Sequence, residues 1–228
     1  METKRTETET KTTPTTVPPI PQTTSCLLCE EYESGKKKKE YTCQTITKHP
    51  VSSLSSKTDQ IIVLVEHTAL TYADALVILG RSGGAREYPI VPGTDFSGIV
   101  IRLGQQWSKQ QQSFVPETNT RFQLGDRVIA HGGTTGRYSD GGFSSLCYCD
   151  ASTLTHIPAS MTTKRAAQLG SAAVTAMYAV LEIESFHRTI KGRREVIISG
   201  ASGSVGGYAL VGFNLFLSTF AQLLLVLY

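Results

Sequence analysis

The sequence predicts an α/β protein whose first part is rich in β-strands. Three observations favour this class. Short apolar segments separated by turn residues follow one another at spacings of 10–20 residues up to about residue 150. A helical pattern replaces them from Thr162 onwards. Near residue 195 a short apolar strand is followed directly by a glycine-rich turn and an apolar helix. The 228 residues allow one large domain or two small ones.

The first 24 residues form a segment with ten Thr and four Pro. Its only large aliphatic residues are Val17 and Ile20, so it cannot bury enough apolar surface to offset the entropy of ordering. We therefore expect residues 1–24 to be disordered. A mitochondrial presequence is the alternative, but three glutamates among the first nine residues argue against it, because such peptides are poor in acids.

The β-rich part begins at residue 25 and predicts several strands and one short helix. The β-branched run at residues 60–67 (QIIVLVEH) is typical of a buried strand, and residues 71–79 predict the helix. The polar residues 105–121 predict a long surface loop, and residues 132–142, with five Gly, predict a flexible loop. Further strands are expected at residues 26–29, 98–103, 128–130 and 143–149.

The second part begins with the helical pattern. Thr162 is expected to cap a helix that runs towards Leu181. Gly170 inside this helix is less favourable than alanine by about 1 kcal/mol, so it indicates a break or a close contact. Residues 195–199 (EVIIS) then predict a short strand.

A glycine-rich turn, residues 200–207 (GASGSVGG), stands between that strand and an apolar helix, which is how nucleotide-binding α/β folds begin. In the pattern Gly-x-Gly-x-x-Gly the first position is Ala201. Gly203 would let the backbone approach a pyrophosphate, and Gly206 would let the helix pack closely on the strand. The helix N-terminus would supply free N–H groups and a partial positive charge.

One part of the dinucleotide-binding sequence pattern is missing. An acidic residue about 20 residues further on normally holds a ribose hydroxyl. Here no charged residue follows Glu195. The alternative interpretation is therefore a glycine-rich turn between a strand and a helix, without a ligand.

Composition excludes several classes of protein. The net charge of +3 and the pI near 8.6 are too small for nucleic-acid binding, which needs clustered Lys and Arg on one face. The one dense basic run, residues 36–39, predicts a solvated hairpin tip. Five Cys with no signal peptide in view indicate reduced thiols in a cytoplasmic protein. Collagen, a small disulfide scaffold, a polytopic membrane protein and a wholly disordered chain are excluded as well.

Six short blocks stand in order along the chain. They are TYADAL at 71–76, PIVPGTDFSG at 89–98, GDRV at 125–128, GGF at 141–143, GSAAVTA at 170–176 and GASGSVG at 200–206. Together they resemble the zinc-independent quinone oxidoreductase and acryloyl-CoA reductase branch of the medium-chain dehydrogenase/reductase superfamily. The resemblance covers residues 25 to about 208, and six ordered blocks are more specific than any one of them.

The resemblance implies a GroES-like β-barrel catalytic domain over residues 25–160, joined to an incomplete Rossmann-type domain over residues 161–228. NADPH would lie between them and pass a hydride to a quinone or to an activated alkene, an enoyl-CoA such as acryloyl-CoA. The partner is then a small-molecule substrate; full-length relatives imply a homodimer, and neither nucleic acid nor a membrane is expected. The alternative is a truncated, non-catalytic fragment of such a reductase that acts as a binding or oligomerisation module.

The resemblance also implies roles for three residues of the first domain. Tyr72 is the candidate catalytic residue and would contact the nicotinamide or the substrate carbonyl. Its alternative is an aromatic side chain that caps the core with its hydroxyl in solvent. Asp74 and Asp95 are expected to orient loops by accepting backbone hydrogen bonds.

The cofactor contacts implied for the second domain fall in two places. Around the pyrophosphate we expect Ser202, Gly203, Ser204, Val205 and Gly206. Ser171 and Thr175 lie where the family's helix faces the cofactor, and packing or hydrogen bonding back to the helix is the alternative for both.

A metal site is not expected. Zinc-dependent relatives have Gly-His-Glu where this chain has residues 93–95 (GTD), and their four-cysteine lobe is missing because residues 96–146 contain no Cys. Cys26, Cys29, Cys147 and Cys149 could in principle form a four-thiolate zinc site. Their strand-like context argues against it, because alternate residues of a strand face opposite sides. His131 is isolated, and a loop or supporting role is expected for it.

The last twenty residues, 209–228 (ALVGFNLFLSTFAQLLLVLY), are uncharged and depart from the family pattern. We favour the tail of a truncated or mis-spliced product. The second alternative is a C-terminal membrane anchor, which the length allows but which Asn214, Gln222 and the absence of flanking basic residues weaken. The third is a buried helix that covers an exposed sheet.

Overall fold

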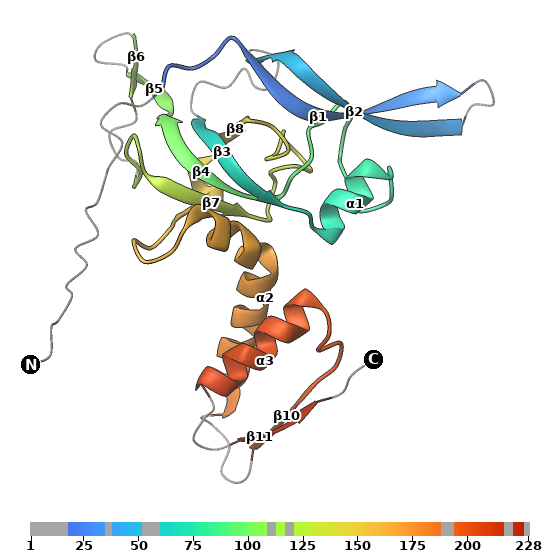
Figure 1. Cartoon of the computed structure of the whole chain (residues 1–228), viewed down its shortest axis with the longest axis vertical. Helices are drawn as coiled ribbons and strands as arrows, with labels where there is room; N and C mark the ends of the chain where they lie inside the picture. The colour runs from blue at the N-terminus through green and yellow to red at the C-terminus, as the bar shows by residue number, and fades with distance from the viewer. Residues whose placement is uncertain are drawn as a thin grey trace, which may run out of the picture.

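The structure is a computed structural model that describes residues 18–34, 38–51, 60–108, 113–116, 121–187, 194–216 and 221–225. Most strands gather at the top of the molecule in Figure 1, and one long helix, α2, descends from them to a small second unit. The expected change from strands to a helix near residue 162 is confirmed.

A long antiparallel hairpin opens the described chain. It consists of β1 (Thr23–Ser34) and β2 (Lys38–Pro50), and its far end projects from the body of the molecule (Figure 1). Two residues of the basic run, Lys38 and Lys39, begin β2 at this hairpin end, while residues 36 and 37 lie outside the described ranges. Strand β1 begins two residues inside the segment for which we expected disorder, and residues 1–17 lie outside the described ranges.

The hairpin also corrects the expectation that all five thiols are reduced. Cys29 and Cys43 stand directly opposite each other in the β1–β2 register, with a Cα–Cα separation of 4.1 Å, and form a disulfide. Closely spaced opposite positions of this kind are the non-hydrogen-bonded pairs of an antiparallel ladder. Cys26, Cys147 and Cys149 are free thiols, and all three are buried.

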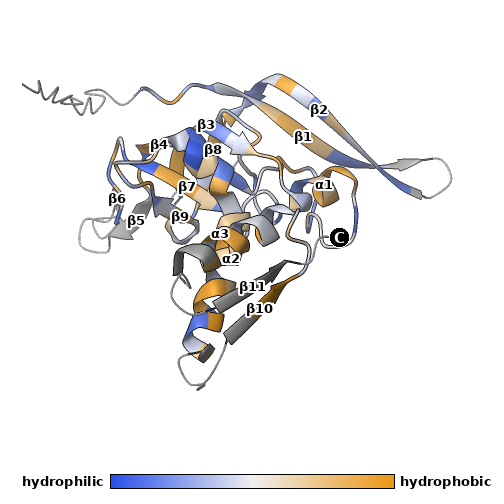
Figure 2. Cartoon of the chain, turned by 60° about the horizontal axis from the view of Figure 1, so that its bottom comes forward, coloured by the Kyte–Doolittle hydropathy of each residue, from blue (hydrophilic) through white to orange (hydrophobic). Residues whose placement is uncertain are grey.

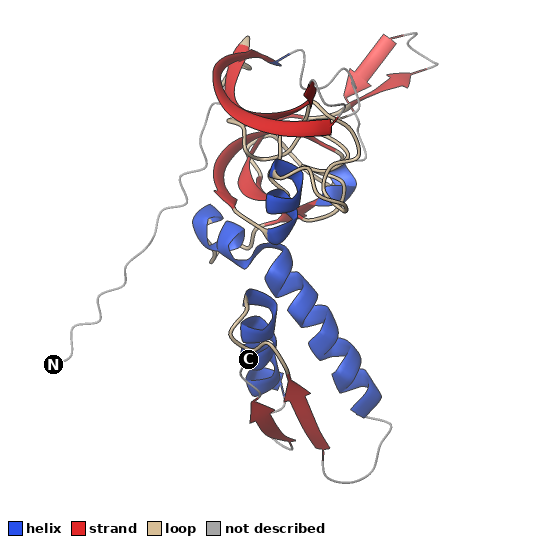
Figure 3. Ribbon diagram, turned by 90° about the vertical axis from the view of Figure 1, so that its right-hand side faces the viewer, coloured by secondary structure: helices blue, strands red, loops and turns tan. Residues whose placement is uncertain are grey.

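The centre of the β-rich part is a five-stranded antiparallel sheet in the order β8-β3-β4-β7-β9. Its strands curve strongly (Figure 3). A single 3₁₀ turn, η2 (Ala151–Thr153), leads into β9. The strand bounds are β3 (Ile61–Ala69), β4 (Asp95–Arg102), β7 (Arg127–His131), β8 (Leu146–Cys149) and β9 (Leu154–His156).

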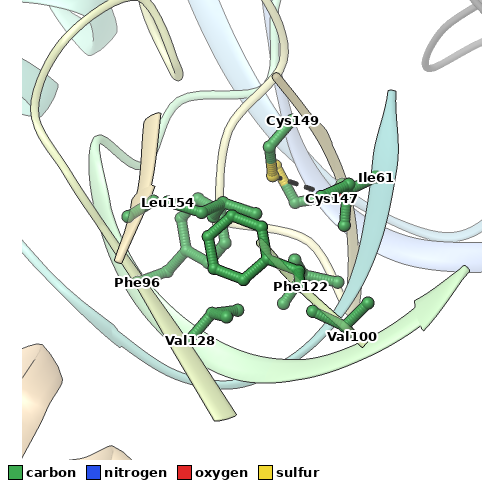
Figure 4. Packing of buried hydrophobic residues seen from close by; sticks show 10 residues of the cluster. Ile61, Phe96, Val100, Phe122, Val128, Cys147, Cys149 and Leu154 are labelled. Carbon is green, nitrogen blue, oxygen red and sulfur yellow. Dashed lines mark hydrogen bonds between the residues drawn. The ribbon is translucent and has the colours of Figure 1, made fainter. Parts of the chain in front are cut away.

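A core of ten buried residues lies against this sheet. Phe96 and Phe122 are the largest, and aliphatic side chains from β3, β4, β7 and β9 surround them (Figure 4). At about 25 cal/mol per Å² of buried apolar surface, such a cluster is the main source of stability for this part of the chain.

The polar stretch that predicts a long surface loop contains two short strands instead. Strand β5 (Gln105–Ser108) pairs with β6 (Ser113–Pro116) in an antiparallel register that sets Trp107 opposite Phe114. Aromatic and β-branched residues favour strands, and three of them interrupt the polar run at 107, 114 and 115. Residues 109–112 and 117–120 lie outside the described ranges.

Two helices carry the chain around the sheet. Helix α1 (Tyr72–Ile78) forms where a short helix was expected. Helix α2 (Thr163–His187) starts after Thr162, whose Oγ1 accepts a hydrogen bond from the backbone N of Arg165 at 3.2 Å, and continues past the expected end. Among the described helices, α2 alone has the length and hydropathy of a membrane span, and it packs on β3, β4, β7 and α3.

The second unit is a β–α–β arrangement of β10 (Arg194–Ile198), α3 (Ser204–Phe216) and β11 (Ala221–Leu225). The two strands are parallel, with Arg194 opposite Ala221 and Ile198 opposite Leu225. Apolar residues dominate α3 and the described part of β10 (Figure 2). They pack on α2 in a cluster that contains Ala176, Val180, Val196, Ile198, Ala201, Ala209 and Phe213.

This arrangement bears on two of the alternatives for residues 209–228, the membrane anchor and the buried helix. They continue α3 to Phe216 and then supply β11, so they are a helix end and a strand. The membrane-anchor and buried-helix alternatives both require one continuous helix, and β11 contradicts both. Pairing with β10 fits the three consecutive Leu of β11, because parallel strands read as continuous apolar runs. Residues 217–220 and 226–228 lie outside the described ranges.

Candidate functional site

A cavity of about 840 Å³ lies between the β-rich part and the β–α–β unit. Its walls come from the start of α1, the start of β4, the loop after β7, the middle of α2, β10 and the glycine-rich turn before α3. Candidate residues that are more than a hundred positions apart in the sequence therefore face one space. Those lining it are Tyr72, Ser171, Thr175, Gly203, Ser204, Val205 and Gly206.

The first wall is fixed by a capping box at the start of α1. Thr71 Oγ1 accepts a hydrogen bond from the backbone N of Asp74 at 3.2 Å, and Asp74 Oδ2 accepts from the backbone N of Thr71 at 2.8 Å. Asp74 is fully buried, and its Oδ1 accepts from the backbone N of Gly93 and Thr94 at 3.1 and 2.9 Å. The expectation that Asp74 orients a loop is confirmed.

Tyr72 is the first residue of α1, and its side chain is 80% exposed. It lines the cavity beside Leu70 and Thr71. Such exposure does not fit an aromatic ring that caps the core, so the alternative interpretation of this residue loses support. The capping box of α1 holds the backbone from which the ring projects.

Asp95 connects the two parts of the chain. It is the first residue of β4 and is 2% exposed. Its Oδ2 accepts hydrogen bonds from the backbone N and the Oγ of Ser171 at 2.6 and 2.8 Å, and its Oδ1 accepts from the backbone N of Gly132 at 2.9 Å. The expected role of Asp95 in orienting loops is confirmed, and it extends to α2.

Helix α2 is broken where these bonds form. Gly170 has φ +47° and ψ −154°, so the residues before and after it are two helical pieces. A Cβ at this position would lie 2.3 Å from Asp95 Oδ2. Both expectations for Gly170, a break and a close contact, are confirmed. The carboxylate of Asp95 therefore accepts the backbone N–H and the hydroxyl of Ser171 at the start of the second helical piece, where a negative charge is favourable.

The glycine-rich turn reaches the cavity through its second half. Helix α3 begins at Ser204, and the backbone N of Gly207 donates a hydrogen bond to Gly203 O at 2.8 Å. The N–H groups of the first helical residues have no acceptor within the helix. They lie at the edge of the cavity that Ser204 and Val205 line.

Two glycines of the turn behave differently. A Cβ at Gly206 would lie 2.3 Å from Gly200 O, so only glycine allows the helix to approach the strand this closely. A Cβ at Gly203 would meet only Gly200 O, at 3.4 Å, so the backbone of Gly203 faces open space. Ser202 is exposed and lies outside the cavity lining, unlike the other residues expected at the pyrophosphate.

Ser171 and Thr175 take different positions within the second piece of α2. Ser171 lines the cavity, but its hydroxyl donates to Asp95 and not to a helix carbonyl. Thr175 lies one turn further on, is exposed and lines the same cavity. The bond to Asp95 makes Ser171 part of the joint between the two parts of the chain.

The four cysteines considered for zinc are separated. Cys26 and Cys29 belong to two different apolar clusters, while Cys147 and Cys149 share a third (Figure 4). Burial raises the pKa of the Cys147 thiol well above its ordinary value, which disfavours the thiolate that zinc requires. His131 Nε2 lies 3.2 Å from Thr155 Oγ1. Within the described ranges no three His, Cys, Asp or Glu side chains converge on one point.

Sequence reasoning missed two contributions to the cavity. The loop after β7 supplies Gly132, Gly133 and Arg137, although its five glycines predict only a flexible loop. Thr94 joins them from the segment before β4, and its Oγ1 lies 3.0 Å from Thr71 Oγ1. The position of these residues just before or after a strand could have indicated them, because such positions gather at one edge of a sheet.

A family model decides the relationship of this chain. The alcohol dehydrogenase GroES-like domain matches residues 57–181, which is more than half of the chain. The chain belongs to the medium-chain dehydrogenase/reductase superfamily. Within it, the chain falls in the branch of the quinone oxidoreductases and acrylyl-CoA reductases. The GroES-like domain expected from the six blocks is thereby confirmed, as is the mixed α/β content.

Relatives of this medium-chain dehydrogenase/reductase are similar over most of the chain but are longer. The chain is 31% identical to the acrylyl-CoA reductase AcuI of Ruegeria pomeroyi over 180 residues, which cover 79% of this chain and 48% of that protein. It is 28% identical to the quinone oxidoreductase-like protein 2 homolog of Nematostella vectensis, over 65% of this chain and 35% of the relative. The chain thus spans about half the length of the curated relatives it matches or less.

A solved structure is similar as well. The yhdH oxidoreductase of Salmonella enterica, crystallised in complex with NADP, superposes with a TM-score of 0.68 at 25% identity. The superposition covers 88% of this chain and 54% of that chain.

Proposed function

We propose that the chain binds NADPH in the cavity between its two parts and reduces an activated alkene, an enoyl-CoA such as acryloyl-CoA, or a quinone. The observation that carries this proposal is the shared cavity of about 840 Å³, lined by Tyr72 on one side and by Gly203–Gly206 on the other. The β–α–β unit would then be the first part of a Rossmann-type domain. The similarity to an acrylyl-CoA reductase and to a structure with NADP supports the choice of cofactor and substrate.

The residues present suit the diphosphate of such a cofactor. The N-terminus of α3 offers N–H groups and a partial positive charge at the cavity edge. The open space at Gly203 lets a phosphate oxygen approach the backbone, and Gly206 keeps the helix close behind it. The adenosine end is less complete, because no charged residue follows Glu195 to hold a ribose hydroxyl or a 2′-phosphate.

When bound, NADPH supplies the hydride, while the protein positions the reactants. Reduction places negative charge on the carbonyl oxygen of the substrate, and a donor aimed at that oxygen lowers the barrier. The Tyr72 hydroxyl is the proposed donor. Thr175 would contact the cofactor along α2. Ser171 would act through Asp95, which sets the angle between the helix and the sheet.

The test combines binding with turnover. NADPH fluorescence is titrated, and NADPH oxidation is followed with acryloyl-CoA and with a small quinone. The variant Gly203→Val should weaken NADPH binding at least tenfold, because its side chain enters the space of the diphosphate. The control Gly207→Ala should bind normally, since a Cβ there would lie an ordinary 3.6 Å from Ala201 O and Gly207 is outside the cavity lining.

The buried Cys26→Ser offers a second control remote from the cavity. Equal NADPH affinity of the wild type and Gly203→Val would contradict the assignment of the turn. Absence of both a fluorescence change and turnover would favour the alternative, a non-catalytic binding or oligomerisation module. The proposal also includes a cytoplasmic location and a homodimer, and sedimentation would test the dimer. It divides the chain into domains over residues 25–160 and 161–228, which limited proteolysis would test.

A further inference from the structure

The cavity contains one cation among its described lining residues. Arg137 is the only Lys or Arg there, and Asp95 is the only Asp or Glu. The carboxylate of Asp95 already accepts three hydrogen bonds from Ser171 and Gly132. No carboxylate of the described residues lies within 4.0 Å of the Arg137 guanidinium. The arginine therefore adds a positive charge to the cavity and forms no direct ion pair with a described acid, although it also lines a smaller pocket with Glu87 and Asp140.

The backbone around Arg137 is held firmly. Thr134 O accepts hydrogen bonds from the backbone N of Arg137 and Tyr138, at 3.2 and 2.8 Å, in a tight turn. The same loop is attached at both ends to the segment before β4. Its N–H groups at 132, 141, 142 and 143 donate to carbonyl oxygens at 94, 91, 93 and 92, at 2.7–3.2 Å. Arg137 thus projects from a preorganised loop, which favours specific recognition.

The side chain is oriented too. Arg137 Nε donates to Gly84 O at 3.4 Å, and Nη2 donates to Gly83 O. These bonds fix the guanidinium plane beside the loop that follows α1, and they use one side of the fork. The guanidinium carbon lies 5.8 Å from the centre of the Tyr138 ring, and Nη1 has no hydrogen-bond partner among the described residues. A planar guanidinium with donors left over is suited to a carboxylate or a phosphate.

From this arrangement we propose that Arg137 recognises an anionic group on the hydride acceptor and selects charged acceptors over neutral ones. The inference rests on the proposed function and deepens it, because it names the class of substrate: an activated alkene that carries a carboxylate or a phosphate. The location favours the substrate, since Arg137 lines the cavity from the β-rich part, as does Tyr72, the proposed donor to the substrate carbonyl, while the diphosphate turn lines it from the β–α–β unit.

Two matched pairs of acceptors test the charge. Monomethyl fumarate and dimethyl fumarate differ in one carboxylate, and acryloyl-CoA and acryloyl-pantetheine differ in the charged 3′-phospho-ADP portion. In Arg137→Gln the KM of one charged member should rise at least tenfold, while the KM of its neutral partner changes less than twofold. The pair that responds identifies the anion as carboxylate or phosphate. Arg137→Lys should restore part of the loss, because it keeps the charge.

The matched control is Arg86→Gln. Arg86 is an exposed arginine whose Nε lies 4.0 Å from Glu87 Oε1, and it lies outside the cavity between the two parts. This variant should leave all four KM values unchanged. The NADPH dissociation constant should also be unchanged in Arg137→Gln. A parallel loss of NADPH affinity, or equal changes for charged and neutral acceptors, would overturn the proposal.

A readout without turnover separates this inference from the proposed function. Calorimetry measures the binding of coenzyme A and of monomethyl fumarate to the wild type and to Arg137→Gln, with NADPH added to both proteins. Binding of either compound that weakens about tenfold in the variant supports the arginine, even if no acceptor is reduced. Binding that is equal in both proteins, or absent in both for both compounds, refutes it, whatever the turnover experiment gives.

Discussion

The two parts of this molecule are stabilised in different ways. The five-stranded sheet has a core of ten residues, each at most 1% exposed, and antiparallel ladders on both sides of its central strands. The β–α–β unit has two parallel strands, and Ile197 on β10 is 65% exposed. Parallel sheets are normally covered on both faces. One wall of the cavity is therefore supported by its own core, while the other depends on its packing against α2.

The largest loss of stability should come from a substitution in the core of the five-stranded sheet. Phe96→Ala removes a fully buried ring and should lower the free energy of unfolding by about 3–5 kcal/mol. Chemical denaturation followed by circular dichroism measures this loss. The exposed Leu79→Ala serves as the control and should change the stability by less than about 0.5 kcal/mol.

Phe213→Ala tests whether the β–α–β unit can loosen while the five-stranded sheet stays folded, because Phe213 belongs to the cluster between α2 and α3. Hydrogen exchange should show faster exchange over residues 194–216, with β3 and β4 still protected. Simultaneous loss of protection in β3 would mean that the two parts unfold as one unit.

A substitution at the contact between Asp95 and helix α2 should cause an intermediate loss of stability. Gly170→Ala would place a Cβ 2.3 Å from Asp95 Oδ2 in a backbone conformation that alanine rarely adopts. We expect a loss of about 1–3 kcal/mol in thermal or chemical unfolding. Ser171→Ala removes one hydrogen bond to Asp95 and should lose about 1 kcal/mol.

The control for this pair is again Gly207→Ala. A helical glycine with room for a Cβ should become neutral or slightly more stable as alanine. If Gly170→Ala proved as harmless as Gly207→Ala, the contact with Asp95 would not be what breaks α2.

The smallest effect concerns Asp140, whose Oδ1 accepts a hydrogen bond from Val91 N at 2.8 Å. Burial raises the pKa of this carboxyl above its ordinary value, although the bond from Val91 opposes the shift. A raised pKa means that the folded state binds the proton more tightly. Its unfavourable contribution is therefore absent below the unfolded pKa and complete above the folded pKa.

Asp140→Asn keeps the acceptor for Val91 and removes the charge. It should raise the free energy of unfolding at pH 7 by less than about 1 kcal/mol and leave it unchanged near pH 3. Denaturation at the two pH values measures the difference. An equal change at both would show that the charge is irrelevant.

Local signals explain which features the sequence could predict. Thr71 and Asp74 lie three residues apart and form the capping box within one turn, so the short helix was predictable. The break at Gly170 was predictable because glycine is unfavourable inside a helix. The glycine pattern at residues 200–206 likewise indicated the strand, turn and helix that the structure shows.

Features that depend on pairing between distant segments were not predictable. The disulfide follows from the register that sets Cys29 opposite Cys43. The Asp95–Ser171 bonds join residues 76 positions apart, and no pattern in one sequence specifies that contact. Strand β11 was missed because a continuous apolar run fits a helix as well as a parallel strand.

The bonds of Asp74 have a consequence for motion within the cavity. One carboxylate holds the first turn of α1 with one oxygen and the backbone at Gly93 and Thr94 with the other. Asp95 follows directly in the chain and holds the start of the second piece of α2. A shift of α2 would therefore be transmitted through Asp95 and Asp74 to the helix that bears Tyr72.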